Sequence, residues 1–78
     1  MLQMLQEYPN GMKYIGAWRD GKYNGYGVME TPHGGKYEGN WKDGLRHGKG
    51  KITFASGATY DGEFFQNMRH GTGVESSP

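Results

Sequence analysis

The chain has 78 residues and a formal net charge of +1, with 15 glycines, 6 tyrosines, 3 phenylalanines, 2 tryptophans and no cysteine. This length allows one domain with a modest core, and the lack of cysteine excludes disulfides, thiolate metal sites and a cysteine nucleophile. The near balance of charge argues against a dedicated nucleic-acid-binding protein. The glycines follow no three-residue period, which excludes collagen, and 14% aromatic residues exclude a simple flexible linker.

The same residue types recur every 23 residues in strict register. Each unit reads Tyr-x-Gly-x-Trp/Phe and, after six further residues, Gly-x-Gly. The motif residues are Tyr14, Gly16, Trp18, Gly25 and Gly27 in the first unit, Tyr37, Gly39, Trp41, Gly48 and Gly50 in the second, and Tyr60, Gly62, Phe64, Gly71 and Gly73 in the third. A period of this length indicates a repeat architecture.

Taken in chain order, each unit predicts one β-hairpin. We assign residues 1–11 to a partial preceding repeat, 12–34 and 35–57 to two full repeats, and 58–78 to a third repeat with a polar tail. Alternation with period two predicts strands, Asp20-Gly21 and Asp43-Gly44 favour tight turns, and Asn67 can adopt the same positive φ. The expected fold is all-β: consecutive antiparallel hairpins in an elongated, single-layer sheet.

The glycines inside the expected strands have a packing explanation. Gly25 and Gly27 lie on one face of a returning strand, where glycine is normally destabilising. Without side chains there, the rings of Tyr14 and Trp18, or their equivalents one unit on, can lie flat over the backbone. We therefore expect ring-over-glycine contacts that form a thin core on one face of the sheet.

Three segments closely resemble the MORN (membrane occupation and recognition nexus) repeat: YIGAWRDGKYNGYG, YEGNWKDGLRHGKG and YDGEFFQNMRHGTG. The typical unit of that family reads Y-x-G-x-W-x-x-G-x-x-x-G-x-G. The resemblance covers residues 12–75, and the middle unit matches every motif position. The third unit departs at Phe64, in place of tryptophan, and at Asn67, in place of the turn glycine. The resemblance implies scaffolding at membranes or the cytoskeleton, including ciliary assemblies, and frequent homodimerisation.

No residues have the spacing of a catalytic or metal site. Ser56 lies in a connecting turn and the other serines in the tail, which does not support a nucleophile–base–carboxylate set. His47 and His70 share a repeat column, but equivalent residues of successive hairpins lie about 9 to 10 Å apart, and no third zinc ligand is evident. The Gly-x-Gly pairs open no helix that could hold a phosphate. We predict no enzyme activity, no metal and no cofactor.

The outward side of the middle hairpin is basic. Lys36, Lys42, Lys49 and Lys51 are accompanied there by one acidic residue, Glu38. Each lysine could attract anionic lipid headgroups by about 1 kcal/mol, which gives a lipid-binding hypothesis. Two acidic residues in the third unit dilute this patch, and scattered surface lysines are common, so an ordinary solvated strand face is the favoured interpretation.

Apolar residues also take outward positions: Ile15, Ala17, Tyr26 and Val28 in the first unit, and Phe65 in the third. Exposed aromatic and branched residues suit a docking surface. Cross-strand packing that stabilises a bare sheet explains them equally well. We take Ile15, Tyr26, Val28 and Phe65 as candidate partner-binding residues.

The sequence thus predicts a non-enzymatic scaffold for protein–protein interaction. A single layer of hairpins leaves one unsupported face and two open edges, so a protein partner or self-association as a homodimer is expected. Two alternatives remain open: a phospholipid-binding module, and an accessory domain of a larger lipid kinase or methyltransferase, with which such repeats are joined. Residues 1–7 do not resemble a signal peptide, and without disulfides the expected location is cytoplasmic. The resemblance to MORN repeats implies association there with the cytoskeleton or a membrane.

Overall fold

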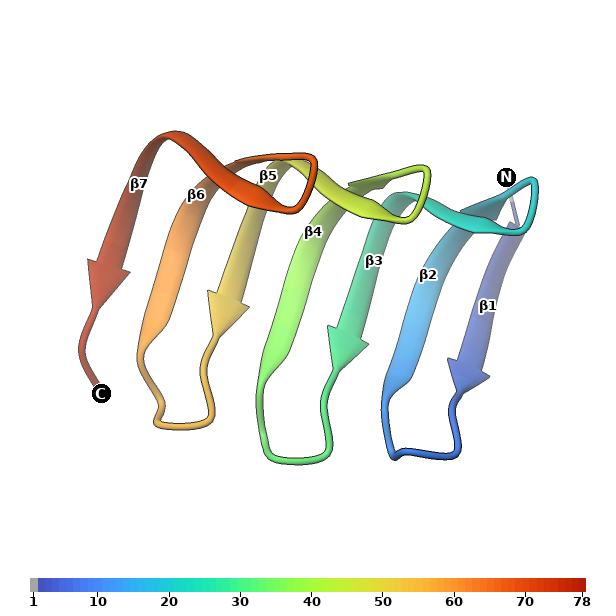
Figure 1. Cartoon of the computed structure of the whole chain (residues 1–78), viewed down its shortest axis with the longest axis horizontal. Coiled ribbons are helices and arrows are strands. Elements are labelled where there is room, and N and C mark those ends of the chain that lie inside the picture. The colour runs from blue at the N-terminus through green and yellow to red at the C-terminus, as the bar shows by residue number, and fades with distance from the viewer. Residues whose placement is uncertain (1) are drawn as a thin grey trace.

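The computed structural model describes residues 2–78, with side chains from residue 4, as one open antiparallel sheet of seven strands in chain order (Figure 1). The strands are β1 (Leu2–Glu7), β2 (Lys13–Arg19), β3 (Lys22–Glu30), β4 (Lys36–Lys42), β5 (Leu45–Thr53), β6 (Thr59–Phe65) and β7 (Met68–Ser76). The pairs β2–β3, β4–β5 and β6–β7 are the three expected hairpins. The prediction of an all-β, single-layer hairpin repeat is confirmed.

The first strand, β1, takes the place of a returning strand one repeat before β3. Leu5 faces Ile15 across β1 and β2, and one repeat later Val28 faces Glu38 across β3 and β4. The assignment of residues 1–11 to a partial repeat remains a prediction, and Met1 lies outside the described residues.

The three hairpin turns share one backbone geometry. Asp20 and Gly21 have φ of 52° and 78°, and the equivalent residues of the second turn have 51° and 84°. In the third turn Gln66 and Asn67 have φ of 49° and 73°. Two successive positive φ values match the twist of hairpin strands, so the expectation for Asn67 is confirmed. The positive φ of Gln66 was not predicted, because glutamine, unlike asparagine, has no preference for this conformation.

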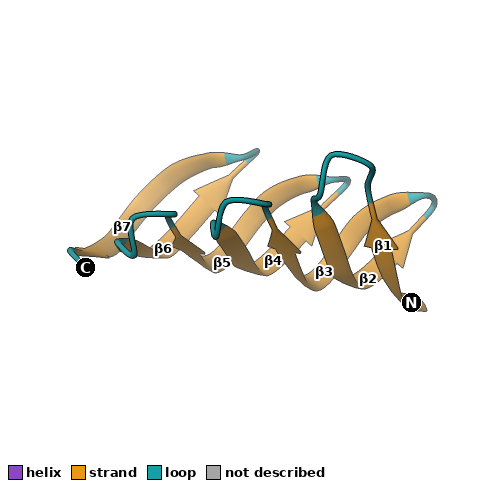
Figure 2. Cartoon of the chain, turned by 90° about the horizontal axis from the view of Figure 1, so that it is seen from below, coloured by secondary structure: helices purple, strands orange, loops and turns teal. Residues whose placement is uncertain are grey.

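The sheet measures 34 × 27 × 15 Å, and its strands bow along their length (Figure 2). All the strongly buried aromatic side chains lie on one face, which we call the inner face; the opposite one is the outer face. The buried aromatic residues are Tyr14, Tyr37, Trp41, Tyr60 and Phe64. Neighbouring rings meet edge to face, with centroids 5.0 to 5.6 Å apart for the pairs that involve Trp41 and a core tyrosine. This row of rings is the thin core that the sequence predicts.

Each core tyrosine lies over a glycine of its own hairpin. An ideal Cβ added at Gly27 would lie 2.0 Å from the phenol oxygen of Tyr14, and one at Gly50 would lie 2.2 Å from that of Tyr37. The third repeat has the same contact, with 2.3 Å at Gly73. No Cβ can occupy these positions while the rings stay in place, so the ring-over-glycine prediction is confirmed for this column.

The prediction was wrong for Gly48 and Gly71 of the neighbouring glycine column, which do not make room for a ring. Gly25, Gly48 and Gly71 have φ of 104°, 82° and 65°. A Cβ at Gly48 or Gly71 would meet nothing nearer than 3.6 Å. These glycines supply a backbone conformation that other residues rarely adopt, at the place where the hairpin register shifts.

Candidate functional site

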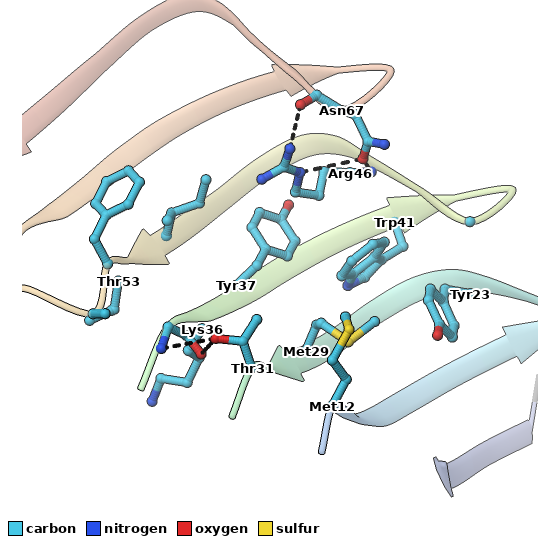
Figure 3. Close-up of a pocket in the computed structure, with 15 residues that line it drawn as sticks. Met12, Tyr23, Met29, Thr31, Lys36, Tyr37, Trp41, Arg46, Thr53 and Asn67 are labelled. Carbon is cyan, nitrogen blue, oxygen red and sulfur yellow. Dashed lines mark hydrogen bonds between the residues drawn. The ribbon is translucent and has the colours of Figure 1, made fainter. Parts of the chain in front are cut away.

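A groove of about 480 Å³ opens on the inner face, where Figure 3 shows its lining. Its apolar lining comes from Met12 before β2, Met29 near the end of β3, Trp41 of β4, Ile52 near the end of β5 and Phe54 just after β5. Trp41 is buried, whereas Phe54 is 39% exposed. The groove is therefore an accessible apolar surface with an aromatic floor.

The repeat columns explain why the groove forms over the first two hairpins. Met29 and Ile52 are equivalent residues of successive units, and the third unit has Glu75 in that column. Phe54 likewise corresponds to Thr31 of the first unit. The apolar lining ends at the third unit, where the charged Glu75 takes the place of Met29 and Ile52. Sequence reasoning missed this groove, although comparing these columns gives the signal.

A cation lies beside the groove. The Arg46 guanidinium lies 5.8 Å from the ring centre of Tyr37 and 5.4 Å from that of Phe64, within cation–π range. Its Nη2 donates to the carbonyl oxygen of Asn67 at 2.6 Å, and its Nε to the Asn67 side chain at 3.3 Å. Arg46 thus connects the second hairpin to the turn of the third.

Arg46 belongs to a column that sequence reasoning also missed. The first unit has Tyr23 there, stacked on Tyr14 with 3.9 Å between ring centres, and the hydroxyl of Tyr23 hydrogen bonds with that of Tyr8. The third unit has Arg69, whose guanidinium lies 4.3 Å from the ring centre of Tyr60. In all three units this column covers the core tyrosine from the solvent side.

Burial favours the neutral form of three phenols, those of Tyr14, Tyr23 and Tyr37, by raising their pKa. Burial raises the pKa of Tyr37 to about 12, while the Arg46 guanidinium acts in the opposite direction. Burial also raises the pKa of Tyr14 and Tyr23. As neutral donors, the hydroxyls of Tyr14 and Tyr37 each donate to a backbone carbonyl three residues on, at 2.9 and 2.8 Å.

Three of the four candidate lipid-binding lysines face or adjoin an acidic residue, and two of them, Lys36 and Lys51, lie next to Glu38. Lys51 lies between Glu38 on β4 and Asp61 on β6, each directly across the strand pair. The Lys36 ammonium is 3.8 Å from a carboxylate oxygen of Glu38. These carboxylates offset the positive charge that an anionic surface would meet.

The other two lysines lie at separate places on the second hairpin. Lys49 faces Glu63 across β5 and β6. Lys42 is exposed at the turn end of β4, opposite Leu45. The four lysines therefore belong to one hairpin without forming a single uninterrupted cationic patch.

The apolar candidates of the first unit lie together on the outer face. Ile15 of β2 faces Leu5 of β1 on one side and Val28 of β3 on the other. Leu5, Ile15 and Tyr26 are each more than half exposed, at 56%, 54% and 57%. We call Leu5, Ile15, Tyr26 and Val28 the outer apolar patch. Ala17, which was expected on the exposed surface, is instead 7% exposed.

Phe65 does not join the outer apolar patch. Its ring lies between two histidine rings, with centroids 5.3 Å from His47 and 5.7 Å from His70. Within residues 2–78, no group of three histidine, cysteine or acidic side chains is placed to hold a metal ion. Nor does the described part of the chain contain a helix that could cross a membrane.

The sheet consists of consecutive antiparallel hairpins, each with a tyrosine ring over a glycine. This arrangement defines a repeat protein in which each repeat contributes one hairpin to the sheet. The family model of the MORN repeat matches residues 14–36, 37–59 and 60–78. The match covers most of the chain, and the chain belongs to this family. A search of curated proteins found no significant match.

Proposed function

We propose that this chain is a non-enzymatic protein-binding module that holds an apolar segment of a partner protein in the inner groove. The observation that carries the proposal is the uncovered groove of about 480 Å³ with Met12, Met29, Ile52 and Phe54 at its walls. A sheet normally buries its apolar face under a second layer. Within the described chain no second layer covers this face, so a partner segment is a suitable cover.

The lining suits peptide side chains. Methionine adapts its shape to irregular partners, and the buried ring of Trp41 gives a rigid floor. Arg46 at the border of the groove favours an acidic residue beside the apolar anchor of the partner. The expected ligand is therefore a short apolar segment with a neighbouring carboxylate.

Family membership supports a place in cytoplasmic scaffolds at the cytoskeleton, at cilia or at membranes, which we include in the proposal. Self-association remains a second way to cover the exposed faces. The phospholipid alternative has less support, because Lys51 lies between two carboxylates and Lys36 lies 3.8 Å from one. The role of accessory domain to a lipid kinase or methyltransferase depends on sequence outside these residues.

The test is affinity purification from the native cell type with quantitative mass spectrometry, using three forms of the chain. Phe54→Thr carries the kind of residue found at the equivalent position of the first unit, Thr31, and removes one wall of the groove. Tyr26→Lys places a lysine in the outer apolar patch. The second unit has the same residue type at the equivalent position, Lys49. We expect Phe54→Thr to lower recovery of direct partners about tenfold, and Tyr26→Lys to leave it unchanged.

The opposite pattern, with loss only in Tyr26→Lys, would move the binding site to the outer apolar patch. Equal recovery with all three forms would refute both sites. Co-sedimentation with vesicles containing anionic phospholipid, at low and high salt, separates lipid binding from protein binding.

A further inference from the structure

The first hairpin has a smaller pocket at the place that corresponds to the inner groove. This first-hairpin pocket has a volume of about 200 Å³, against about 480 Å³ for the groove. Most of its lining stands exactly one repeat before residues that line the groove. The lining residues concerned are Tyr8, Trp18, Gly21, Tyr23 and Gly44, which correspond in that order to Thr31, Trp41, Gly44, Arg46 and Asn67. The pocket and the groove are therefore equivalent sites of successive repeats.

Tyr8 occupies much of the first-hairpin pocket. Its hydroxyl hydrogen bonds with that of Tyr23, and the ring of Tyr23 stacks on the core ring of Tyr14. The residue that corresponds to Tyr8 in the groove is Thr31, whose short side chain bonds with the backbone of Gly35 at 3.1 and 3.2 Å. The groove is thus open at the place where an aromatic side chain of the chain itself closes the equivalent site.

The two connections that carry Tyr8 and Thr31 have the same backbone conformation. The N–H of each of these residues donates to the carbonyl four residues on, at 2.9 Å. Each connection also has a glycine of similar positive φ, 95° at Gly11 and 91° at Gly34. Because the allowed side-chain directions follow from the backbone, a tyrosine at position 31 would point into the groove as Tyr8 points into its pocket.

Arg46 determines which atom the groove binds beside an aromatic ring. Arg69, in the same column of the third unit, forms an ion pair with Glu75. Ile52 stands in the column of Glu75, so the second unit has no carboxylate at that place. An arginine side chain has five N–H donors, and among the described residues Arg46 uses two of them, both toward Asn67. Its other donors can bind an oxygen atom of a ligand.

We propose that the partner segment enters the groove with a tyrosine, which takes the place that Tyr8 takes in the first-hairpin pocket. Its ring lies over the floor formed by Trp41, and its phenol oxygen accepts a hydrogen bond from the Arg46 guanidinium. A hydrogen bond with a charged donor is stronger than one between neutral groups. The exposed tyrosine of the chain itself, Tyr26, lies on the outer face and cannot enter its own groove. This inference rests on the proposed function, because it names the partner residue that the groove holds.

Three matched peptides test the tyrosine: acetyl-Ala-Tyr-Ala-amide, and two versions with phenylalanine or leucine at the central position. Proton–nitrogen correlation NMR follows the indole N–H signals of Trp41, in the groove, and of Trp18, in the first-hairpin pocket. With the full 78-residue chain, we expect the tyrosine peptide to shift the Trp41 signal and leave the Trp18 signal in place. The phenylalanine and leucine peptides should bind about tenfold more weakly, since they offer no oxygen to Arg46.

The comparison of peptides separates this inference from the proposed function. Equal binding of the phenylalanine and tyrosine peptides would overturn the tyrosine and its bond with Arg46, while the groove would remain a binding site for apolar side chains. Equal binding of all three peptides would do the same. Absence of binding by all three would overturn both the inference and the proposed groove.

Exchange of residues between the two sites tests their equivalence. Thr31→Tyr gives the groove an internal tyrosine and should weaken binding of the tyrosine peptide at least about tenfold. The matched control Thr31→Ser keeps the hydroxyl and should leave binding unchanged. Tyr8→Thr opens the first-hairpin pocket, so the tyrosine peptide should then shift the Trp18 signal as well. Unchanged binding by folded Thr31→Tyr, or no response of Trp18 in folded Tyr8→Thr, would refute the inference.

Circular dichroism confirms folding, and if Thr31→Tyr does not fold, Tyr8→Thr and the three peptides decide the question. Sedimentation equilibrium tests a second copy as the occupant. A dimer of the unmodified chain that Tyr26→Lys dissociates and that the tyrosine peptide displaces would show that Tyr26 of another copy fills the groove. That result would overturn the assignment to a different partner protein.

Discussion

Tyr37 is a residue whose burial depends on its neighbours in three strands. Its ring is 5% exposed, lies over Gly50 and meets Trp41 at 5.0 Å, and its hydroxyl donates to the carbonyl of Asn40 at 2.8 Å. The phenol can take this place only as a neutral donor, because an anion there would lose hydration and its hydrogen bond. The stability of the sheet is therefore linked to the protonation of this group.

Stability should fall in strongly alkaline solution. The pKa of Tyr37 is raised from 10.0 to about 12 in the folded chain, so the folded state holds its proton more tightly than the unfolded state. This contribution is complete below pH 10 and is lost as the pH rises from 10 to 12, by roughly 2 to 3 kcal/mol in total. Urea unfolding at pH 8, 10 and 11.5 measures it. Tyr37→Phe should reduce the slope, because it removes the hydroxyl that titrates in this range.

For single residues, the sequence predicts that a ring lies over Gly27, but it does not predict the role of Gly25. The ring over Gly27 follows from alternation alone, since Tyr14 and Gly27 must share the inner face. The role of Gly25 does not, because a need for space and a need for positive φ both select glycine. The structure distinguishes them in the same column at Gly48, where φ is 82° and an added Cβ would meet nothing nearer than 3.6 Å.

Among the secondary-structure elements, the third hairpin turn reverses the chain and also contacts the preceding hairpin. The third turn reaches back to the second hairpin, where the Asn67 side chain accepts from the backbone N–H of Arg46 at 2.9 Å and from its Nε at 3.3 Å. The first two turns have glycine at this position, Gly21 and Gly44, and offer no side chain. The departure from the family pattern at Asn67 therefore adds a contact between repeats.

A double-mutant cycle measures this contact. Arg46→Met removes the guanidinium, and Asn67→Gly restores the turn residue of the other units, which tolerates φ of 73° well. We expect a coupling energy of about 1 kcal/mol in urea unfolding, because the cycle removes both side chains joined by the charged hydrogen bond from Arg46 Nε to Asn67 Oδ1. The control cycle pairs Asn67→Gly with Arg69→Met, which lies in the same column and has no contact of this kind with the turn. Its effects should add within about 0.5 kcal/mol, and equal coupling in both cycles would contradict the contact.

The sequence predicts the turns but not this connection between hairpins. Asp-Gly and Asn67 at fixed spacing are local signals for positive φ, and they need no knowledge of the neighbouring unit. The partnership of Arg46 with Asn67 depends on how far one hairpin bends toward the previous one. The same limit applies to the groove, whose walls come from strands and connections that only the curvature of the sheet brings together.

In the molecule as a whole, each strand is stabilised by the strands beside it in a single-layer sheet. Within the part of the chain that the structure describes, every internal strand pairs on both sides, whereas β1 and β7 each pair on one side. The outer apolar patch could be predicted from register, since Leu5, Ile15 and Val28 occupy one cross-strand row. Which face receives a partner could not, because both faces of a single layer carry exposed apolar residues.

Local stability should therefore rise toward the middle of the sheet. β4 and β5 contribute buried Tyr37 and Trp41 and half-buried Ile52 to the continuous core, whereas every residue of β7 is exposed. In a repeat protein whose units contact only their neighbours, the end units open first. Hydrogen exchange should be slowest in β4 and β5 and at least about tenfold faster in β7. Uniform protection would contradict this and show one cooperative unit.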